Sequence, residues 1–267
     1  MVNKPMTGQT PEVRVEIHGD LPPGTAEVAR STVLALVEET REPVLSVRIR
    51  LTRMDDPTVE RPCLAQANLD VNGRRARAQV AAETMSEAVG LLRERIVLQL
   101  ARVSRHLESQ RGGVPEAGEY ERLLRTEPVH RPHHCPHPAE LREVVRHKSF
   151  SLPRETPDQA AFAMDTMDYG FRLFTDLTTG EDSVLYRAAP TGYRLAQVHP
   201  RPERLGAAAI PLTISSAPAP RLNLVNAKRR MDALGQPFVY FADDATGRGN
   251  VLYRRYDGHY GLITPTE

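Results

Sequence analysis

The chain has 267 residues, a net charge of +1 at pH 7 and a hydrophobic share of 40%. This length allows one large domain or two to three small ones with real hydrophobic cores. The near-neutral charge excludes a general electrostatic attraction to nucleic acid, so an RNA-binding surface needs a local arrangement of arginines. The first dozen residues are polar, and no stretch approaches the roughly 18 apolar residues that span a bilayer. We expect a cytoplasmic protein.

The first part of the chain, residues 12–110, has the pattern of a small α+β domain. Alternating apolar residues predict four strands, over 13–19, 44–51, 64–71 and 75–80. Apolar residues at helical spacing predict two helices, the first capped by Thr25 and ending near Arg41, the second from about Ser86 to Ser109. Asn72-Gly73 predicts a tight hairpin turn. The order β-α-β-β-β-α predicts an antiparallel sheet with both helices on one face.

Arginines recur at positions that strand and helix phase bring together. Alternation sends five of them to the sheet face opposite the helices, namely Arg14, Arg48, Arg50, Arg75 and Arg77. Three more share one flank of the second helix, namely Arg95, Arg102 and Arg105. Such a surface can bind phosphates. The alternative is an ordinary solvated face, since Glu12, Glu16 and Asp70 share the sheet side.

Residues 111–146 are rich in proline, glycine and histidine and are typical of a linker. The stretch HRPHHCPHP contains five side chains able to bind zinc, namely His130, His133, His134, Cys135 and His137. The prolines between them and the lack of a second ligand pair at finger spacing argue against a structural metal site. We expect no metal and no cofactor, and favour contact between these histidines and RNA. With Cys63 as the second cysteine, nothing indicates a disulfide.

The rest of the chain repeats itself at an offset of 67 residues without a gap. Examples are Asp165 and Asp232, TG at 179 and 246, and VLYR at 184 and 251. This indicates an internal duplication, with copies over 147–200 and 210–267. Each copy has the pattern of a short strand, a helix and three strands. The last three are expected over 171–176, 183–188 and 193–198, and over 238–243, 250–255 and 259–264.

A sheet of three or four short strands with one helix is marginally stable alone, so we expect each copy to bury its apolar face against another copy. Aromatic and branched residues of the strands are the candidates for this interface: Phe171, Phe174, Val184, Tyr186, Tyr193, Phe238, Phe241, Val251, Tyr253 and Tyr260. The tyrosines can also stack on bases, but their alternating positions favour packing.

The final stretch, LGQPFVYFADDATGRGNVLYRRYDGHYGLITP, resembles the terminal motif of the long ribosome hibernation promoting factors, which carry an S30AE-type N-terminal domain. The residues that carry this resemblance include Ala245-Thr246-Gly247, Tyr253-Arg254-Arg255 and Tyr260-Gly261-Leu262-Ile263. The N-terminal part is similar in element order, in Ile17 and Gly19, and in LDVNG at 69–73. The two matches cover most of the chain outside the linker.

The resemblance implies that the first domain binds 16S rRNA at the decoding region of the 30S subunit. There it would block mRNA and tRNA and silence the 70S ribosome during stress, stationary phase or dormancy. Arg95, Arg102 and Arg105 would replace the family's basic helix, and Arg48, Arg50, Arg75 and Arg77 would contact phosphates. Leu98 and Ser104 depart from the family, which often carries basic side chains there.

The family's terminal domain usually occurs once and joins two ribosomes by pairing between molecules. Two copies in one chain lead us to the hypothesis that they pair in cis, without forming ribosome dimers. The alternatives are pairing between molecules, general mRNA binding and a pure oligomerisation module. No nucleophile elbow, Walker motif, zinc-protease motif or Rossmann glycine pattern occurs, so we expect no enzymatic activity.

Overall fold

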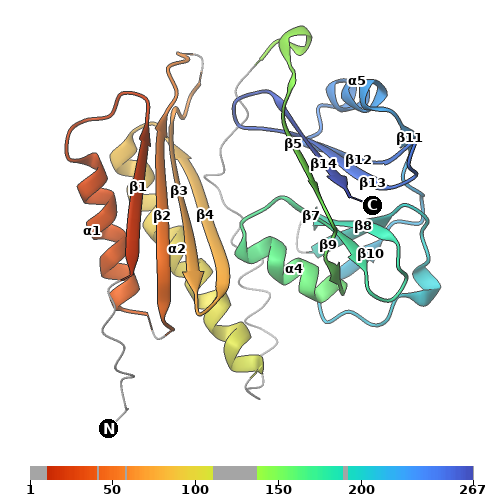
Figure 1. The fold of residues 1–267 in the computed structure, drawn as a ribbon, viewed down its shortest axis with the longest axis horizontal. Helices are drawn as coiled ribbons and strands as arrows, with labels where there is room; N and C mark the ends of the chain where they lie inside the picture. Colours follow the sequence, from red (N-terminus) through yellow and green to blue (C-terminus); the bar gives the residue numbers. More distant parts are fainter. Residues whose placement is uncertain (1–10, 41, 58, 111–136, 189–191, 267) are drawn as a thin grey trace. The chain divides into compact units, whose positions relative to one another are not determined.

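The computed structural model describes residues 11–40, 42–57, 59–110, 137–188 and 192–266. The chain forms two compact units, one built on the elements up to α2 and the other on the elements from η1 onward (Figure 1). Each unit mixes strands and helices, which confirms the predicted α+β class. Within the described ranges, no helix is both long and apolar enough to cross a membrane.

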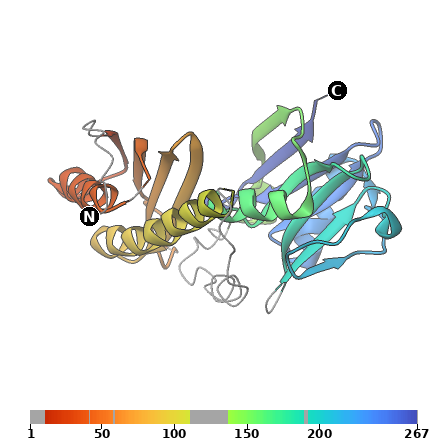
Figure 2. The same ribbon diagram turned by 90° about the horizontal axis from the view of Figure 1, so that it is seen from below.

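The first unit is a four-stranded sheet with two helices on one face. Its elements are β1 (Glu12–His18), α1 (Thr25–Glu38), β2 (Val44–Arg53), β3 (Cys63–Val71), β4 (Arg74–Ala82) and α2 (Met85–Gln110). The strand order is β1-β2-β3-β4. Figure 2 shows both helices on the same side of these strands, as predicted from the sequence.

This sheet is mixed rather than wholly antiparallel. β1 pairs with β2 in the parallel sense, whereas the β2–β3 and β3–β4 pairs are antiparallel. The reason is the connection: α1 lies between β1 and β2, and a helical crossover returns the chain in the same direction, whereas a tight hairpin reverses it. Asn72 and Gly73 adopt positive φ of 52° and 80° in the predicted β3–β4 hairpin.

The start of α1 differs from the sequence prediction. Gly24, with φ of 84°, occupies the cap position, and glycine has no side chain to cap the helix. The Thr25 hydroxyl instead donates to the backbone oxygen of Pro22 at 2.6 Å. The helix also ends at Glu38, three residues before the predicted end.

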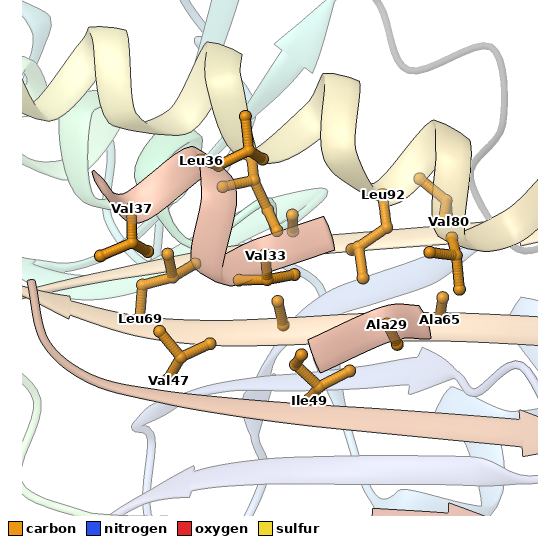
Figure 3. Packing of buried hydrophobic residues seen from close by; sticks show 14 of the residues in the cluster. Ala29, Val33, Leu36, Val37, Val47, Ile49, Ala65, Leu69, Val80 and Leu92 are labelled. Atoms are coloured by element: carbon orange, nitrogen blue, oxygen red, sulfur yellow. The ribbon is translucent and has the colours of Figure 1, made fainter. Parts of the chain in front are cut away.

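The helices pack on the sheet through one continuous core (Figure 3). Ala29 and Val33 of α1 and Leu92 of α2 face the strand residues Ile49 and Ala65, and all five side chains are almost fully buried. Alanines at the inward positions of β3 and β4 are fully buried or nearly so, and their small side chains let a helix approach the sheet closely.

The second unit contains two five-stranded sheets and two copies of the predicted repeat. The first copy is β6 (Arg154–Glu155), α4 (Pro157–Thr166), β7 (Phe171–Asp176), β8 (Asp182–Ala188) and β9 (Gly192–Gln197). The second is β11 (Arg221–Leu222), α5 (Leu224–Leu234), β12 (Phe238–Asp243), β13 (Gly249–Arg254) and β14 (Tyr260–Pro265). Short 3-10 helices, η1 (Ala139–Leu141) and η2 (Pro202–Arg204), lie before and after the first copy.

The fifth strand of each sheet comes from the segment that precedes the other copy. β5 (Val144–Phe150) precedes the first copy but pairs with β14 of the second, as Figure 1 shows. β10 (Leu212–Ile214) precedes the second copy but pairs with β9 of the first. The sequence pattern does not predict this exchange, and the predicted linker includes the first three residues of β5. All seven β5 residues are exposed or half-buried, so the strand lacks a clear apolar alternation.

Matching turns explain the repeated TG pairs. One Asp176 carboxylate oxygen accepts hydrogen bonds from the backbone N–H groups of Thr178 and Thr179 and from the Thr179 hydroxyl. Asp243 binds Ala245 and Thr246 in the same way. Gly180 and Gly247 follow with positive φ of 73° and 70°, which glycine adopts at little cost.

We expect Gly180→Ala to lower the free energy of unfolding of the second unit by about 1 to 2 kcal/mol, because alanine is strained at positive φ. A Cβ there would contact nothing within 4 Å, so the backbone angle alone sets the cost. Chemical denaturation followed by near-ultraviolet circular dichroism measures the effect. The control is Gly206→Ala, where a Cβ is equally unhindered and φ is not positive; an equal loss in both variants would contradict this account.

Candidate RNA-binding face and repeat interface

The sheet face of the first unit that lies opposite the helices carries a row of arginines. In the sheet register Arg14 lies beside Arg48, Arg48 beside Asn68, and Asn68 beside Arg77. The first two arginines are exposed and Arg77 is half-buried. The row therefore crosses all four strands with three positive charges and one amide, a pattern suited to phosphate oxygens.

The neighbouring row is largely neutralised. The Arg50 guanidinium donates to Glu16 at 2.8 Å, and Arg48 approaches the same carboxylate at 3.6 Å. The hydrogen bond from Arg50 lowers the pKa of Glu16, so this carboxylate stays ionised. Arg14 pairs with Glu12 at 2.7 Å. These pairs are exposed, so each contributes little to stability and can open to admit a phosphate.

β4 carries the remaining arginines of this face. Arg75 is exposed and lies beside Asp70 in the register. Arg77 donates to the side-chain oxygens of Gln66 and Gln79, which holds its guanidinium against the sheet. All five arginines predicted from strand phase thus lie on the same sheet face.

The arginines of α2 form a separate group on the helix. Arg95 and Arg102 share one flank, and both are buried. Arg95 forms an ion pair with Asp168 at 2.7 Å, and Arg102 donates to Gln99 at 3.3 Å. Arg105 lies less than a turn further on. Burial, with a contribution from Arg74 at the start of β4, lowers the pKa of His106, which favours the neutral imidazole. The α2 group and the sheet group lie on opposite faces of the sheet.

The two sheets of the second unit pack through their inner faces, which share one apolar cluster. Six of the ten predicted interface residues belong to this cluster or pack on it: Phe171, Val184, Tyr186, Phe238, Val251 and Tyr253. Leu173 and Tyr240, which were not among the predicted interface residues, belong to it as well. They stand two residues after Phe171 and Phe238, so strict strand alternation was the signal that would have found them.

The contacts in this cluster are reciprocal. Phe171 and Phe238 are equivalent positions of the two copies, and their ring centroids lie 4.9 Å apart. Phe171 also approaches Tyr253 at 5.8 Å, and its counterpart Phe238 approaches Tyr186, the counterpart of Tyr253, at 5.4 Å. This exchange of equivalent partners is the pattern of a two-fold interface, here within a single chain.

The other four predicted interface residues lie in the cores of their own copies. Phe174 and Tyr193 pack under α4 in the first copy, and Phe241 and Tyr260 pack under α5 in the second. Their placement differs from the prediction because side chains alternate across a strand: Phe174, three residues after Phe171, faces the opposite side. Each buried tyrosine hydroxyl donates to a carboxylate in its own copy, Asp165 or Asp232, at 2.6 Å.

A polar contact between the copies was also missed. The Asp182 carboxylate in β8 accepts from Arg248 at 2.7 Å and from the backbone N–H of Gly249 at 2.9 Å. The Tyr240 hydroxyl donates to the backbone oxygen of Asp182 at 2.5 Å. Burial, with the Asp182 charge, raises the pKa of Tyr240 well above its ordinary value, so the phenol stays protonated and remains a donor.

Four of the five candidate zinc ligands in HRPHHCPHP lie outside the described residues. His137 is described, and its ring lies 4.5 Å from that of His259. In the parts of the chain that the structure covers, no three histidine, cysteine or acidic side chains cluster as a metal site would need.

A double-mutant cycle tests the ring contact between the copies. We expect Phe171→Ala and Phe238→Ala to couple by about 1 kcal/mol in the free energy of unfolding, because each ring loses its partner. The matched control is Phe174→Ala with Phe241→Ala, an equivalent pair whose rings lie in separate cores. Its coupling should be near zero, and equal coupling in both cycles would contradict the interface described here.

Comparison with known proteins extends these observations. The family model described as "Sigma 54 modulation/S30EA ribosomal protein C terminus" matches the chain twice, over residues 139–195 and 215–262. These segments contain the two copies, so the same domain family accounts for both.

Individual relatives cover more of the chain. The dormancy associated translation inhibitor of Mycobacterium tuberculosis is 42% identical over 226 residues, covering 82% of this chain and 76% of that protein. The ribosome hibernation promotion factor of Bacillus subtilis is 53% identical over 38 residues, which are 14% of this chain and 20% of that protein. A solved ribosomal subunit interface protein from Coxiella burnetii is 17% identical, covers 34% of this chain and 98% of its own, and has a TM-score of 0.29. At 42% identity over most of both chains, this protein belongs to the long-form ribosome hibernation promoting factor family.

Proposed function

We propose that this protein silences individual 70S ribosomes by occupying the decoding region of the 30S subunit. Membership of the hibernation factor family supports ribosome binding, and the 42% identical relative is named as a translation inhibitor. We infer that the protein binds individual ribosomes, and does not join two of them, from the apolar cluster that the two copies share. A pairing face whose apolar residues are buried or half-buried against the other copy offers little surface to join a second ribosome.

The first unit is the proposed rRNA-binding domain. Its arginine row, Arg14, Arg48 and Arg77, crosses the whole sheet, and Arg75 extends it along β4. Arginine binds phosphate through two parallel donors, so such a row can follow an RNA backbone. Bound at the decoding region, the domain would exclude mRNA and tRNA by occupancy, without chemistry. Of the α2 arginines, Arg95 and Arg102 are buried and Arg95 pairs with Asp168, so only the half-buried Arg105 would contact rRNA without a rearrangement.

The second unit is the proposed self-paired module. Covalent connection gives the two copies an effective concentration in the millimolar range or higher, so pairing within the chain competes strongly with pairing between chains. The exchanged strands β5 and β10 add backbone hydrogen bonds to each sheet. Separating the copies would expose both the apolar cluster and two new strand edges, which is unfavourable in water.

Sucrose-gradient sedimentation of vacant 70S ribosomes with the purified protein tests the proposal. We expect the protein to migrate with 70S particles and no peak of ribosome dimers to form. A dimer peak would retain ribosome binding but exclude pairing within the chain. Protein left at the top of the gradient, together with binding to free single-stranded RNA, would support general mRNA binding instead.

Charge reversal tests the sheet face. The double variant Arg48→Glu and Arg77→Glu should weaken ribosome binding at least tenfold and reduce the slope of log affinity against log salt by roughly 2, about 1 for each phosphate that is no longer bound. The control is Arg204→Glu, an exposed arginine of η2 outside the first unit. Binding of the double variant equal to that of the control would show that this face is not the rRNA surface.

A further inference from the structure

The geometry points to a selectivity device at the centre of the repeat interface. We propose that Asp182, Arg248 and Gly249 restrict each copy to the opposite kind of partner, so that the first copy pairs with the second and neither pairs with another copy of itself. This inference rests on the proposed pairing of the copies and extends it, because it assigns the specificity to particular residues.

Asp182 and Gly249 occupy equivalent positions of the two copies, 67 residues apart, and they face each other in the structure. Phe171 and Phe238 do the same. An equivalent pair in mutual contact lies on the approximate two-fold axis of the interface. If two identical copies paired in this way, each residue on the axis would meet itself.

The space on this axis admits one side chain. A Cβ built on Gly249 would lie 2.9 Å from the Cβ of Asp182 and 2.8 Å from the Tyr240 hydroxyl oxygen. These separations are shorter than real Cβ contacts. Asp182 therefore needs glycine opposite it, and two first copies would bring two aspartates into a space that holds one.

The charges at the axis also differ between the copies: the first copy has carboxylates where the second has an arginine and a glycine. Glu181 and Asp182 of the first copy correspond to Arg248 and Gly249 of the second. The observed pairing gives Arg248 a carboxylate at 2.7 Å. Two first copies would bring two Asp182 carboxylates together at the axis, without Arg248 to pair with either, while Glu181 pairs with Arg201 at 3.0 Å. Two second copies would bring together two arginines with no carboxylate from this position. The Asp182 side chain is 8% exposed, and a charge at such a site is costly without its partner.

Tyr240 adds a third difference between the copies. Its hydroxyl crosses the interface to the backbone oxygen of Asp182, whereas its counterpart in the first copy is Leu173, which has no donor. Two first copies would lack this hydrogen bond on both sides. Two first copies therefore fail in packing, in charge and in hydrogen bonding. Two second copies leave a space at Gly249 and oppose two arginines without the Asp182 carboxylate, whereas the mixed pair satisfies packing, charge and hydrogen bonding together.

Two full-length variants test this selectivity, without ribosomes. Asp182→Arg places a positive charge opposite Arg248, and Arg248→Asp places a negative charge opposite Asp182. Each breaks pairing within its own chain and leaves one unaltered copy that would have to pair with its own kind. We expect each variant alone to sediment as a monomer, with protection of β8 and β13 from hydrogen exchange lowered at least tenfold.

The mixture of the two variants is the informative sample. The unaltered first copy of one chain fits the unaltered second copy of the other, and the two altered copies oppose the introduced arginine to the introduced aspartate. We expect a one-to-one heterodimer in sedimentation velocity. The chain carrying both substitutions should also sediment as a monomer, and it should recover part of the lost protection of β8 and β13. Asp244→Arg, an exposed change of the same charge, should match the unaltered protein.

Homodimers of either single variant, as abundant as the heterodimer, would overturn the inference. Unaltered protection of β8 and β13 in both variants would overturn it as well. If Asp182→Arg fails to fold, Asp182→Asn replaces it, because asparagine has nearly the same size as aspartate. We expect faster hydrogen exchange in β8 and β13 of this variant than in those of the control Asp244→Asn. Equal exchange in the two variants would contradict the role of the Asp182 charge. Because ribosomes are absent, failure here leaves the proposed ribosome silencing to be judged by the gradient experiment.

Discussion

The organisation of the second unit depends on one constraint, which is that each small sheet has two apolar faces and only one helix. In the first copy α4 covers the face that carries Phe174 and Leu195, and the other face, with Phe171 and Val184, still needs cover. A sheet of four or five short strands buries too little surface to tolerate an apolar face in water. The second copy covers it, and its own exposed face is covered in return.

Exchange of β5 and β10 joins the two copies by a second physical mechanism. Each strand extends the sheet of the copy that it does not directly precede, through parallel backbone hydrogen bonds. The apolar cluster and the exchanged strands are disrupted together when the copies separate, so the two contributions to pairing are coupled. In the structure the unit has the arrangement of a two-fold dimer whose halves share one chain. This arrangement accounts for reciprocal contacts such as Phe171 with Tyr253 and Phe238 with Tyr186.

Sequence patterns predicted the elements better than their partners. Period-2 and helical spacing located the strands and helices of the first unit to within a few residues, and the 67-residue offset located both copies, because these signals are local. The parallel β1–β2 pair follows from the α1 crossover, a rule of connection and not of residue pattern. The origin of β5 and β10 was missed because edge strands carry no strong alternation. The interface was only partly predicted: Phe171 and Phe174 have the same chemistry, and strand phase alone assigns them to different cores.

Duplication within one chain also explains how an asymmetric contact can arise on a symmetric interface. In a homodimer, a residue on the two-fold axis meets its own copy, so any change there occurs twice: an aspartate would face an aspartate, and a glycine would leave an empty space opposite a glycine. In one chain with two copies, the two equivalent positions on the axis can be substituted independently. A large side chain at one position then requires only that the residue at the other position be small.

Asp182 opposite Gly249 is such a pair. Arg248 is the counterpart of Glu181 in the second copy. Its positive charge lies beside the Asp182 carboxylate, which is buried away from water. An interface specialised in this way gains complementarity for the partner in its own chain and loses the fit to a second identical copy, since both properties follow from the same three residues.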